Sequence, residues 1–146
     1  WNESPTEVYT NTSNDAYAVS TTGYAGDFDY EWTPDNATNN DKLLFGVSLV
    51  STNRQYDDAT PWKWTVNTRS GNKIQFIEDG STTSESSETC VFDSTKIRIV
   101  RVGTSLKAYL GATEIKDFGT FSGTAYLHFG VVQPAGRIMN LPRVSA

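Results

Sequence analysis

Short alternations of apolar and polar residues run along most of the chain. Residues 27–32 read Asp-Phe-Asp-Tyr-Glu-Trp, with an aromatic residue at every second position. Residues 96–110 contain two further alternating runs, separated at Gly103 and Thr104. Successive side chains of a β-strand point to opposite faces of a sheet, so this pattern predicts antiparallel strands with one buried face. Because no long stretch follows a helical period, we expect an all-β chain.

Turn-forming residues interrupt the alternation about every eight to twelve residues, which is typical of sandwiches and barrels. Two sheets that each offer one apolar face must pack together, because a single sheet would leave that face in water. The sequence therefore predicts an antiparallel two-sheet β-sandwich, with residues 1–15 as a polar, loop-like N-terminal segment. Pro142 inside the last run predicts an edge position or a bulge. The predicted strands are Tyr17–Ser20, Gly26–Thr33, Leu43–Val50, Trp62–Thr68, Lys73–Glu78, Lys96–Val102, Leu106–Leu110, Thr113–Phe118, Ala125–Val132 and Arg137–Val144.

The apolar members of the alternating runs give the predicted core. Trp62, Trp64 and Val66 occupy alternate positions, which predicts that they share one face and that both tryptophans are buried. Arg101 is predicted to be a polar position of its strand. Four large residues are predicted to be buried in the core: Trp32, Phe45, Ile99 and Phe129.

Length and charge narrow the function classes. The chain has 146 residues and a net charge of −5, which fits one domain over residues 1–146. Nucleic-acid binding needs a basic face, and the basic residues here are scattered, so we expect no nucleic-acid partner. No run approaches the roughly 20 apolar residues that span a bilayer, so we expect no membrane insertion. Because the chain begins at Trp1, we expect a fragment or a processed product.

Cysteine and histidine are too few for several kinds of chemistry. The chain has one cysteine, Cys90, and one histidine, His128, so it can form neither an intrachain disulfide nor a zinc site of these residue types. His128 lies in an apolar run, where a strand histidine beside the core is a better interpretation than a member of a catalytic triad. We therefore expect no cofactor.

The order of the runs resembles that of a known fold family. GDFDYEW is followed by LLFGVSL, IQFIEDG, KIRIVRVGTSLKAYLGATEI, YLHFGV and a closing GRIMNL. This order resembles the concanavalin A-like domains, jelly-roll sandwiches that include laminin-G-like modules, carbohydrate-binding modules and head domains of viral and phage attachment fibres. The resemblance covers about residues 21–141 and implies a jelly-roll fold, and such folds host unrelated activities.

Asp27, Asp29 and Glu31 are the candidate catalytic residues. Carboxylates at alternate positions of a strand point to one face, and retaining glycosidases need two carboxyl groups about 5–5.5 Å apart. Some jelly-roll glycoside hydrolases carry Glu-x-Asp-x-Glu on one strand, whereas this chain has the shorter Asp27 at the first position. The alternative, which we favour, is an acidic outer face of a surface strand. We therefore do not expect an enzyme.

The loop Thr52–Pro61 holds the candidate ligand-binding residues. Sugar recognition typically combines an exposed aromatic ring with oxygens that bind the hydroxyl groups. Tyr56 supplies such a ring, Asp57 and Asp58 supply acceptors, and Trp62 follows the loop directly. The acidic pair favours neutral or basic ligands over sialylated ones. A solvated loop without a ligand is the alternative.

Two other loops are long and polar. Pro34–Lys42 contains Asp35, Asn39 and Asp41, whose oxygens suit Ca²⁺, although their spacing fits no defined calcium loop. A solvated loop without a metal is the preferred interpretation there. Gly80–Thr89 is small, polar and acidic, and we expect it to be mobile.

Together these features predict a non-enzymatic recognition domain. The expected partner is a cell-surface glycan or protein receptor. The expected location is extracellular or on a virion surface, as an adhesin or as the head of a viral or phage attachment fibre. A homo-oligomer, a trimer in the case of a fibre head, is compatible with this interpretation. Two alternatives stay open, namely a jelly-roll glycoside hydrolase using Asp29 and Glu31, and a structural virion or assembly module.

Overall fold

The structure, a computed structural model, describes residues 7–10, 16–34, 42–52, 56–57, 59, 61–69, 72–91, 94–132 and 142–146. No helix within these ranges is long and apolar enough to cross a membrane. The described residues form twelve strands, β1 (Glu7–Thr10), β2 (Ala16–Val19), β3 (Phe28–Trp32), β4 (Lys42–Ser48), β5 (Trp64–Arg69), β6 (Lys73–Glu78), β7 (Ser81–Glu85), β8 (Ile97–Val102), β9 (Ser105–Leu110), β10 (Thr113–Thr120), β11 (Tyr126–Val132) and β12 (Arg143–Ser145).

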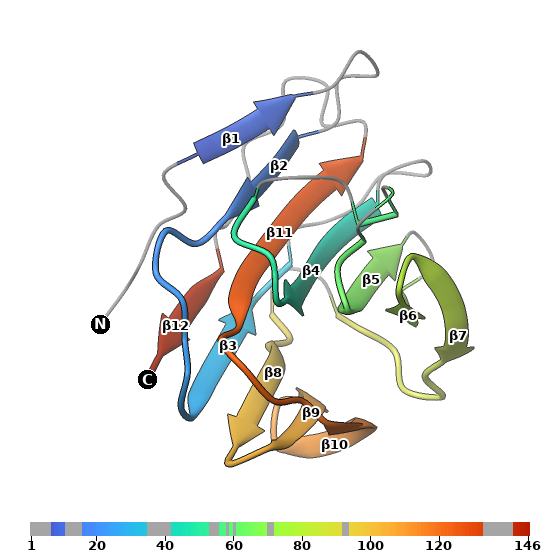
Figure 1. Cartoon of the computed structure of the whole chain (residues 1–146). Coiled ribbons are helices and arrows are strands. Elements are labelled where there is room, and N and C mark those ends of the chain that lie inside the picture. Colours follow the sequence, from blue (N-terminus) through green and yellow to red (C-terminus); the bar gives the residue numbers. More distant parts are fainter. Residues whose placement is uncertain are drawn as a thin grey trace.

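The strands form two antiparallel sheets that pack into a sandwich, as predicted (Figure 1). In the described part of the chain, the larger sheet has seven strands in the order β1-β2-β11-β4-β5-β6-β7, and the smaller has five in the order β10-β9-β8-β3-β12. Strands that are far apart in the sequence are therefore neighbours, for example β11 between β2 and β4. The four strands predicted between residues 96 and 132 are confirmed as β8 to β11.

Two strands lie where the sequence predicted loops. Part of the segment 1–15 forms β1, which pairs with β2 at the edge of the larger sheet. Gly80–Thr89 was predicted to be a mobile loop, but Ser81–Glu85 forms β7 at the opposite edge. An edge strand that is exposed on both faces shows no apolar alternation, so its sequence resembles a loop. Threonine nevertheless favours strands, and the Thr83 hydroxyl donates to the Phe76 carbonyl at 3.2 Å where a bulge interrupts the pairing.

The last strand is shorter than predicted within the described residues. The predicted run was Arg137–Val144, and the structure has β12 at Arg143–Ser145, paired with β3. Residues 137–141 lie outside the described residues. β12 is the outermost strand of the smaller sheet, which confirms the edge position predicted from Pro142.

The core between the sheets contains the predicted residues. Trp32, Phe45, Ile99 and Phe129 are all at most 7% exposed, which confirms their predicted burial. The Trp32 ring meets Phe45 and Phe129 edge-on, with centroids 5.8 and 6.1 Å away, a favoured aromatic geometry. The Tyr30 hydroxyl also ties the sheets together, because it donates to the His128 carbonyl at 2.8 Å.

Arg101 corrects the predicted faces of β8. It was predicted to be a polar position, yet it lies on the face of Ile97 and Ile99 and is 4% exposed. Its guanidinium is buried because backbone carbonyls at the end of the sandwich accept its hydrogens. Nε donates to Gly103 O at 2.9 Å and Nη1 to Gly123 O at 2.7 Å. A buried charge that is bonded in this way avoids much of its desolvation cost.

Candidate functional site

The outer face of the larger sheet, turned away from the core, carries buried polar side chains. Ser48 on β4, Thr65 and Asn67 on β5, and His128 on β11 are each at most 3% exposed. The strand register sets His128 opposite Gly46, and Gly46 opposite Thr65, so these side chains gather at the centre of the sheet. We call Ser48, Thr65, Asn67 and His128 the outer polar face.

Trp62 covers part of this face. Its ring stacks on the His128 ring, with centroids 4.9 Å apart and planes at 29°. The Tyr17 and Tyr56 rings meet it edge-on, at 6.2 and 6.5 Å. The approach requires a glycine beneath, since a Cβ on Gly46 would lie 3.0 Å from Trp62 Cε3. Tyr56 packs from outside against a small cluster whose buried members are Tyr17, Leu44, Trp62 and Ile77.

The predicted position of Trp62 on the face of Trp64 and Val66 is wrong. Trp64 and Val66 belong to the core between the sheets, whereas Trp62 packs in the separate cluster on the outer face. The predicted strand Trp62–Thr68 begins instead at Trp64, so the alternation does not extend back to Trp62. The Trp62 amide donates to the Tyr56 carbonyl at 3.3 Å, which closes the preceding loop. The ring proposed from the sequence as a ligand contact is therefore fully covered in this structure.

Ser48 and His128 form a buried hydrogen-bonded pair. Ser48 Oγ lies 2.7 Å from His128 Nε2, and it donates to the Val50 carbonyl at 2.9 Å. Because the hydroxyl hydrogen goes to Val50, we assign the proton between Ser48 and His128 to Nε2. The strand histidine beside the core that the sequence predicted is confirmed, and its bond to Ser48 fixes the ring on which Trp62 stacks.

Asn67 and Thr65 have polar atoms that the described residues leave without a hydrogen-bond partner. Asn67 Nδ2 donates to Gln75 Oε1 at 3.2 Å, but Asn67 Oδ1 has no partner. Thr65 Oγ1 is likewise buried and unpartnered among the described residues. Leaving a buried donor or acceptor unsatisfied costs about 1–3 kcal/mol, so native proteins retain few such groups. These two oxygens are the unsatisfied members of the outer polar face.

The structure places two of the predicted loop residues beside this face. Tyr56 is half-buried rather than exposed, because its ring packs against Trp62, while Asp57 is exposed. A Cβ on Gly80 would lie 3.1 Å from Asp57 Cα, so the loop rests on the turn between β6 and β7. Asp58 lies outside the described residues. Tyr56 and Asp57 thus stand at the rim of the site.

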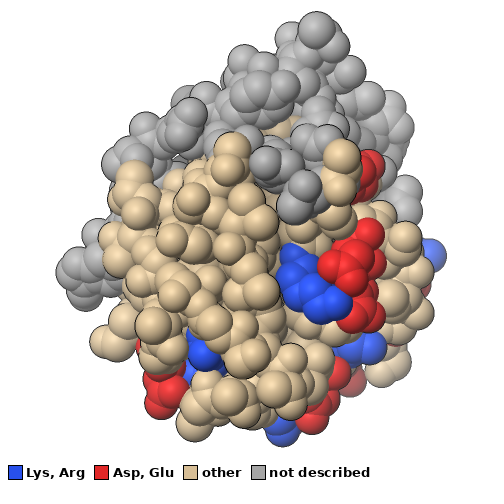
Figure 2. Space-filling view, in the orientation of Figure 1, with Lys and Arg blue, Asp and Glu red and all other residues tan. Residues whose placement is uncertain are grey.

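An ion-pair cluster fixes the chain next to the loop. Lys63 Nζ lies 2.8 Å from both Glu78 Oε1 and Asp79 Oδ2. Lys63 donates to both carboxylates, and these hydrogen bonds, first the one to Asp79 and then the one to Glu78, raise the pKa of Lys63. Figure 2 shows that charged side chains gather in a few patches on this side of the molecule and leave a broad area uncharged.

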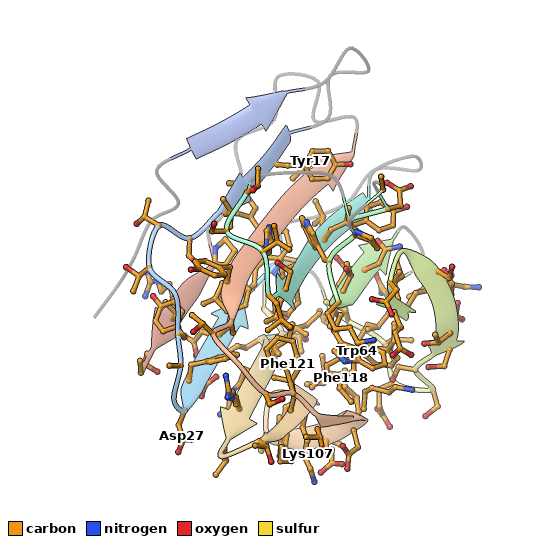
Figure 3. The ribbon with its side chains drawn as sticks, in the orientation of Figure 1. Tyr17, Asp27, Trp64, Lys107, Phe118 and Phe121 are labelled. Carbon is orange, nitrogen blue, oxygen red and sulfur yellow. The ribbon has the colours of Figure 1, made fainter. Side chains whose placement is uncertain are left out.

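The three candidate catalytic carboxylates lie elsewhere. Asp29 and Glu31 share the outer face of the smaller sheet, as predicted. Arg98 Nε donates to both Asp29 oxygens at 3.0 and 3.1 Å, and Lys96 Nζ lies 3.1 Å from Glu31. Asp27 is exposed and accepts from the Gly103 amide at 2.7 Å. Figure 3 places Asp27 far from Tyr17, which belongs to the cluster around Trp62.

The Asp29–Arg98 pair has a clear electrostatic consequence. Hydrogen bonding to Asp29 raises the pKa of Arg98, with the nearby Asp29 and Glu31 charges acting in the same direction. Bidentate contact with a guanidinium occupies the carboxylate oxygens that would have to attack or protonate a substrate. The arrangement pairs the outer carboxylates of β3 with neighbouring cations.

The metal candidates Asp35, Asn39 and Asp41 lie outside the described residues. Within the described ranges, no group of three or more His, Cys, Asp or Glu side chains is placed to hold a metal ion. The sequence analysis missed Ser48, Thr65 and Asn67 as site residues. Their signal was present in part, because polar residues on the central strands β4 and β5 must be buried once both faces of the sheet are covered.

Known structures share this fold at low sequence identity. The carbohydrate recognition domain of Emp47p superposes with a TM-score of 0.61 at 12% identity, over 99% of this chain and 83% of that one. The carbohydrate-binding module CBM66 from Bacillus subtilis gives 0.51 at 15%, over 98% and 94%. The alginate lyase AlgAT5 of polysaccharide lyase family 7 gives 0.54 at 8%, over 98% and 83%. No protein-family model matches the chain, and no curated protein matches its sequence.

These similarities establish the fold class. The chain is a concanavalin A-like jelly-roll sandwich, the class that the order of its strands resembled. Of the three similar structures named above, two are named for carbohydrate recognition or binding and the third for polysaccharide cleavage. At such identities the likeness carries the fold alone.

Proposed function

We propose that the chain is a non-catalytic module that binds a carbohydrate at the outer polar face and the loop beside it. One observation carries the proposal. Two buried polar oxygens, Thr65 Oγ1 and Asn67 Oδ1, lack a partner among the described residues and lie on the face where aromatic rings cluster. Hydroxyl groups of a sugar would satisfy such oxygens, and aromatic rings would cover its apolar face.

In this proposal, residues of the loop before Trp62 are the first to contact the sugar. Tyr56 is the outermost ring of the cluster, and Asp57 is exposed next to it. Asp57 accepts hydrogen bonds from sugar hydroxyls and disfavours sialylated ligands through like-charge repulsion, and the same role for Asp58 stays a prediction from the sequence. Because both oxygens are buried, a bound sugar reaches them only when the groups that cover them move aside. Trp62 then lines the opened site.

The absence of catalysis is part of the same proposal. It is supported by the ion pairs of Asp29 and Glu31, which occupy the carboxylates that a jelly-roll hydrolase would use. Incubation with laminarin and alginate tests it directly, with reducing ends and unsaturated products as readouts. We expect no turnover, and turnover that disappears in Glu31→Gln would promote the hydrolase alternative.

The narrower setting is proposed on the same basis. A recognition module of this kind would act outside the cell on a cell-surface glycan, as an adhesin or as the head of a viral or phage fibre. The alternative partner, a protein receptor, and assembly into a homo-oligomer stay predictions from the sequence. A structural virion or assembly module stays the second alternative, and it predicts no glycan binding at all.

A glycan array tests the proposed function. We expect the isolated chain to bind a defined set of glycans and the double variant Tyr56→Ala with Asp57→Ala to lose that binding. The matched control is Tyr109→Ala with Asp117→Ala, which removes a half-buried tyrosine and an exposed aspartate from the smaller sheet. Circular dichroism checks that both variants fold. Equal binding by the two variants would place the site away from this loop.

A further inference from the structure

Three polar side chains form a continuous line across the larger sheet. Asn67 on β5 lies opposite Gln75 on β6, which lies opposite Glu85 on the edge strand β7. Asn67 Nδ2 donates to Gln75 Oε1 at 3.2 Å, and Gln75 Nε2 donates to Glu85 Oε2 at 3.3 Å. The line joins an exposed carboxylate at the edge of the sheet to a side chain that is 3% exposed near its centre.

The charge of Glu85 favours one direction for the hydrogen bonds of the line. An ionised carboxylate can only accept, so Gln75 must turn its amide nitrogen toward Glu85. The Gln75 oxygen then faces Asn67, which must turn its own nitrogen toward Gln75. Asn67 Oδ1 is consequently directed away from the line, where the described residues offer it no partner.

Thr65 completes the arrangement on the same strand. Thr65 and Asn67 are two residues apart on β5 and therefore point to the same face. Thr65 Oγ1 is fully buried and unpartnered among the described residues. A hydroxyl can donate or accept, but the Asn67 oxygen can only accept. The pair consequently lacks at least one donor.

We propose that Glu85 and Gln75 fix the ligand class of the site by holding Asn67 Oδ1 as an acceptor. This inference rests on the proposed carbohydrate-binding function. A neutral sugar hydroxyl donates to Asn67 Oδ1 and exchanges a hydrogen bond with Thr65. A uronic acid carboxylate at the same place would bring its acceptor oxygens against Asn67 Oδ1, which is also an acceptor. The site therefore disfavours uronates. Glu85 is a positioning residue, since it acts through Gln75 and does not touch the ligand.

The variant Glu85→Lys is expected to reverse the direction of the hydrogen bonds in the line. A lysine ammonium can only donate, so Gln75 must turn its oxygen toward residue 85 and its nitrogen toward Asn67. Asn67 then turns its oxygen toward Gln75 and presents its nitrogen to the ligand. On an array of neutral oligosaccharides and their matched uronates, we expect the neutral members to bind about tenfold more weakly, the loss of one hydrogen bond. We expect the uronates to gain affinity.

The control is Glu88→Lys. It makes the same change of charge at an exposed position three residues along the chain, with no side-chain contact to Gln75 among the described interactions. We expect it to keep the wild-type preference for neutral glycans. Equal shifts in both lysine variants would mean that long-range charge alone sets the preference, and this would overturn the inference. Wild-type protein that prefers uronates would also overturn it.

A second readout needs no glycan. In nuclear magnetic resonance spectra of the ligand-free protein, we expect the side-chain amide signal of Asn67 to move in Glu85→Lys and to stay in place in Glu88→Lys. An Asn67 side-chain signal with the same chemical shift in both variants as in wild type would overturn the inference even if glycans bind. A clear movement of this signal in a chain that binds no glycan would support the positioning of Asn67 and refute the proposed function.

Discussion

The two outer faces of the sandwich differ in how exposed their polar side chains are and in how completely these are paired. On the smaller sheet, Asp29 pairs with Arg98 and Glu31 with Lys96, and all four side chains are partly exposed. On the larger sheet, the outer polar face consists of hydroxyl, amide and imidazole groups that are almost fully buried and only partly hydrogen-bonded. Both faces alternate regularly with the same core, and they differ because the chain before β5 folds back and Trp62 covers part of the larger sheet.

The comparison separates structural from functional polar groups. Paired surface charges keep a sheet soluble. Each exposed pair adds no more than about 1 kcal/mol to the free energy of unfolding. Buried oxygens without partners lower stability, and natural proteins keep such local conflicts mainly at functional sites. In the function proposed above, the smaller sheet's outer face supports the fold and that of the larger sheet carries recognition.

Loss of the Trp62 ring should have the largest effect. Trp62→Ala removes a fully buried ring that stacks on His128, so we expect the free energy of unfolding to fall by ~3–5 kcal/mol. Tyr109→Ala on the smaller sheet removes a half-buried ring and should cost only about 1 kcal/mol. Urea denaturation of both variants measures the contrast. Similar losses would show that the two faces are packed alike.

High pH should lower the free energy of unfolding through groups buried in the core between the faces. Burial raises the pKa of the Cys90 thiol from 9.0 to about 11, and burial also raises that of Tyr30 well above its ordinary value. Between pH 9 and 11 the unfolded chain releases the thiol proton and the folded chain keeps it. Stability is therefore intact below pH 9 and falls as pH rises, by about 2–3 kcal/mol for Cys90. Denaturation of wild type and Cys90→Ala across this range should differ by that amount, and parallel curves would contradict it.

Breaking the principal ion pair of the smaller sheet should have a small effect. Asp29→Ala leaves Arg98 without its carboxylate, but the guanidinium is partly exposed and returns to water. We expect a loss of at most about 1 kcal/mol, shrinking further in 1 M NaCl. Glycan binding should not change. A loss of binding in this variant would show that the binding site lies on the smaller sheet, and it would contradict the contrast between the two faces.

The core of the fold could be predicted from sequence, while two edge strands and the site could not. Phe28, Tyr30 and Trp32 alternate with acidic residues, so periodicity alone identifies β3. β7 is exposed on both faces and has no such pattern, and only its pairing with β6 defines it. Trp62 was assigned to the wrong side because the strand begins two residues later than the alternation suggests.

The outer polar face could not be predicted for a related reason. Polar residues at Thr65 and Asn67 look like a solvated face until the chain before β5 folds back and Trp62 covers the sheet. The sequence predicted Tyr56 and Asp57 as ligand contacts, and the structure packs Tyr56 against Trp62 and sets Asp57 beside Gly80. Their role in binding stays a prediction.

Thr65→Val tests the central claim most directly, because valine keeps the shape of threonine and removes the unpartnered hydroxyl. If the hydroxyl is kept for a ligand, its removal should raise the free energy of unfolding by about 1 kcal/mol, since a buried unsatisfied group is lost. The same variant should bind glycans at least tenfold more weakly than wild type. A destabilised Thr65→Val protein with unchanged glycan binding would show that the hydroxyl supports the fold, and it would contradict the account.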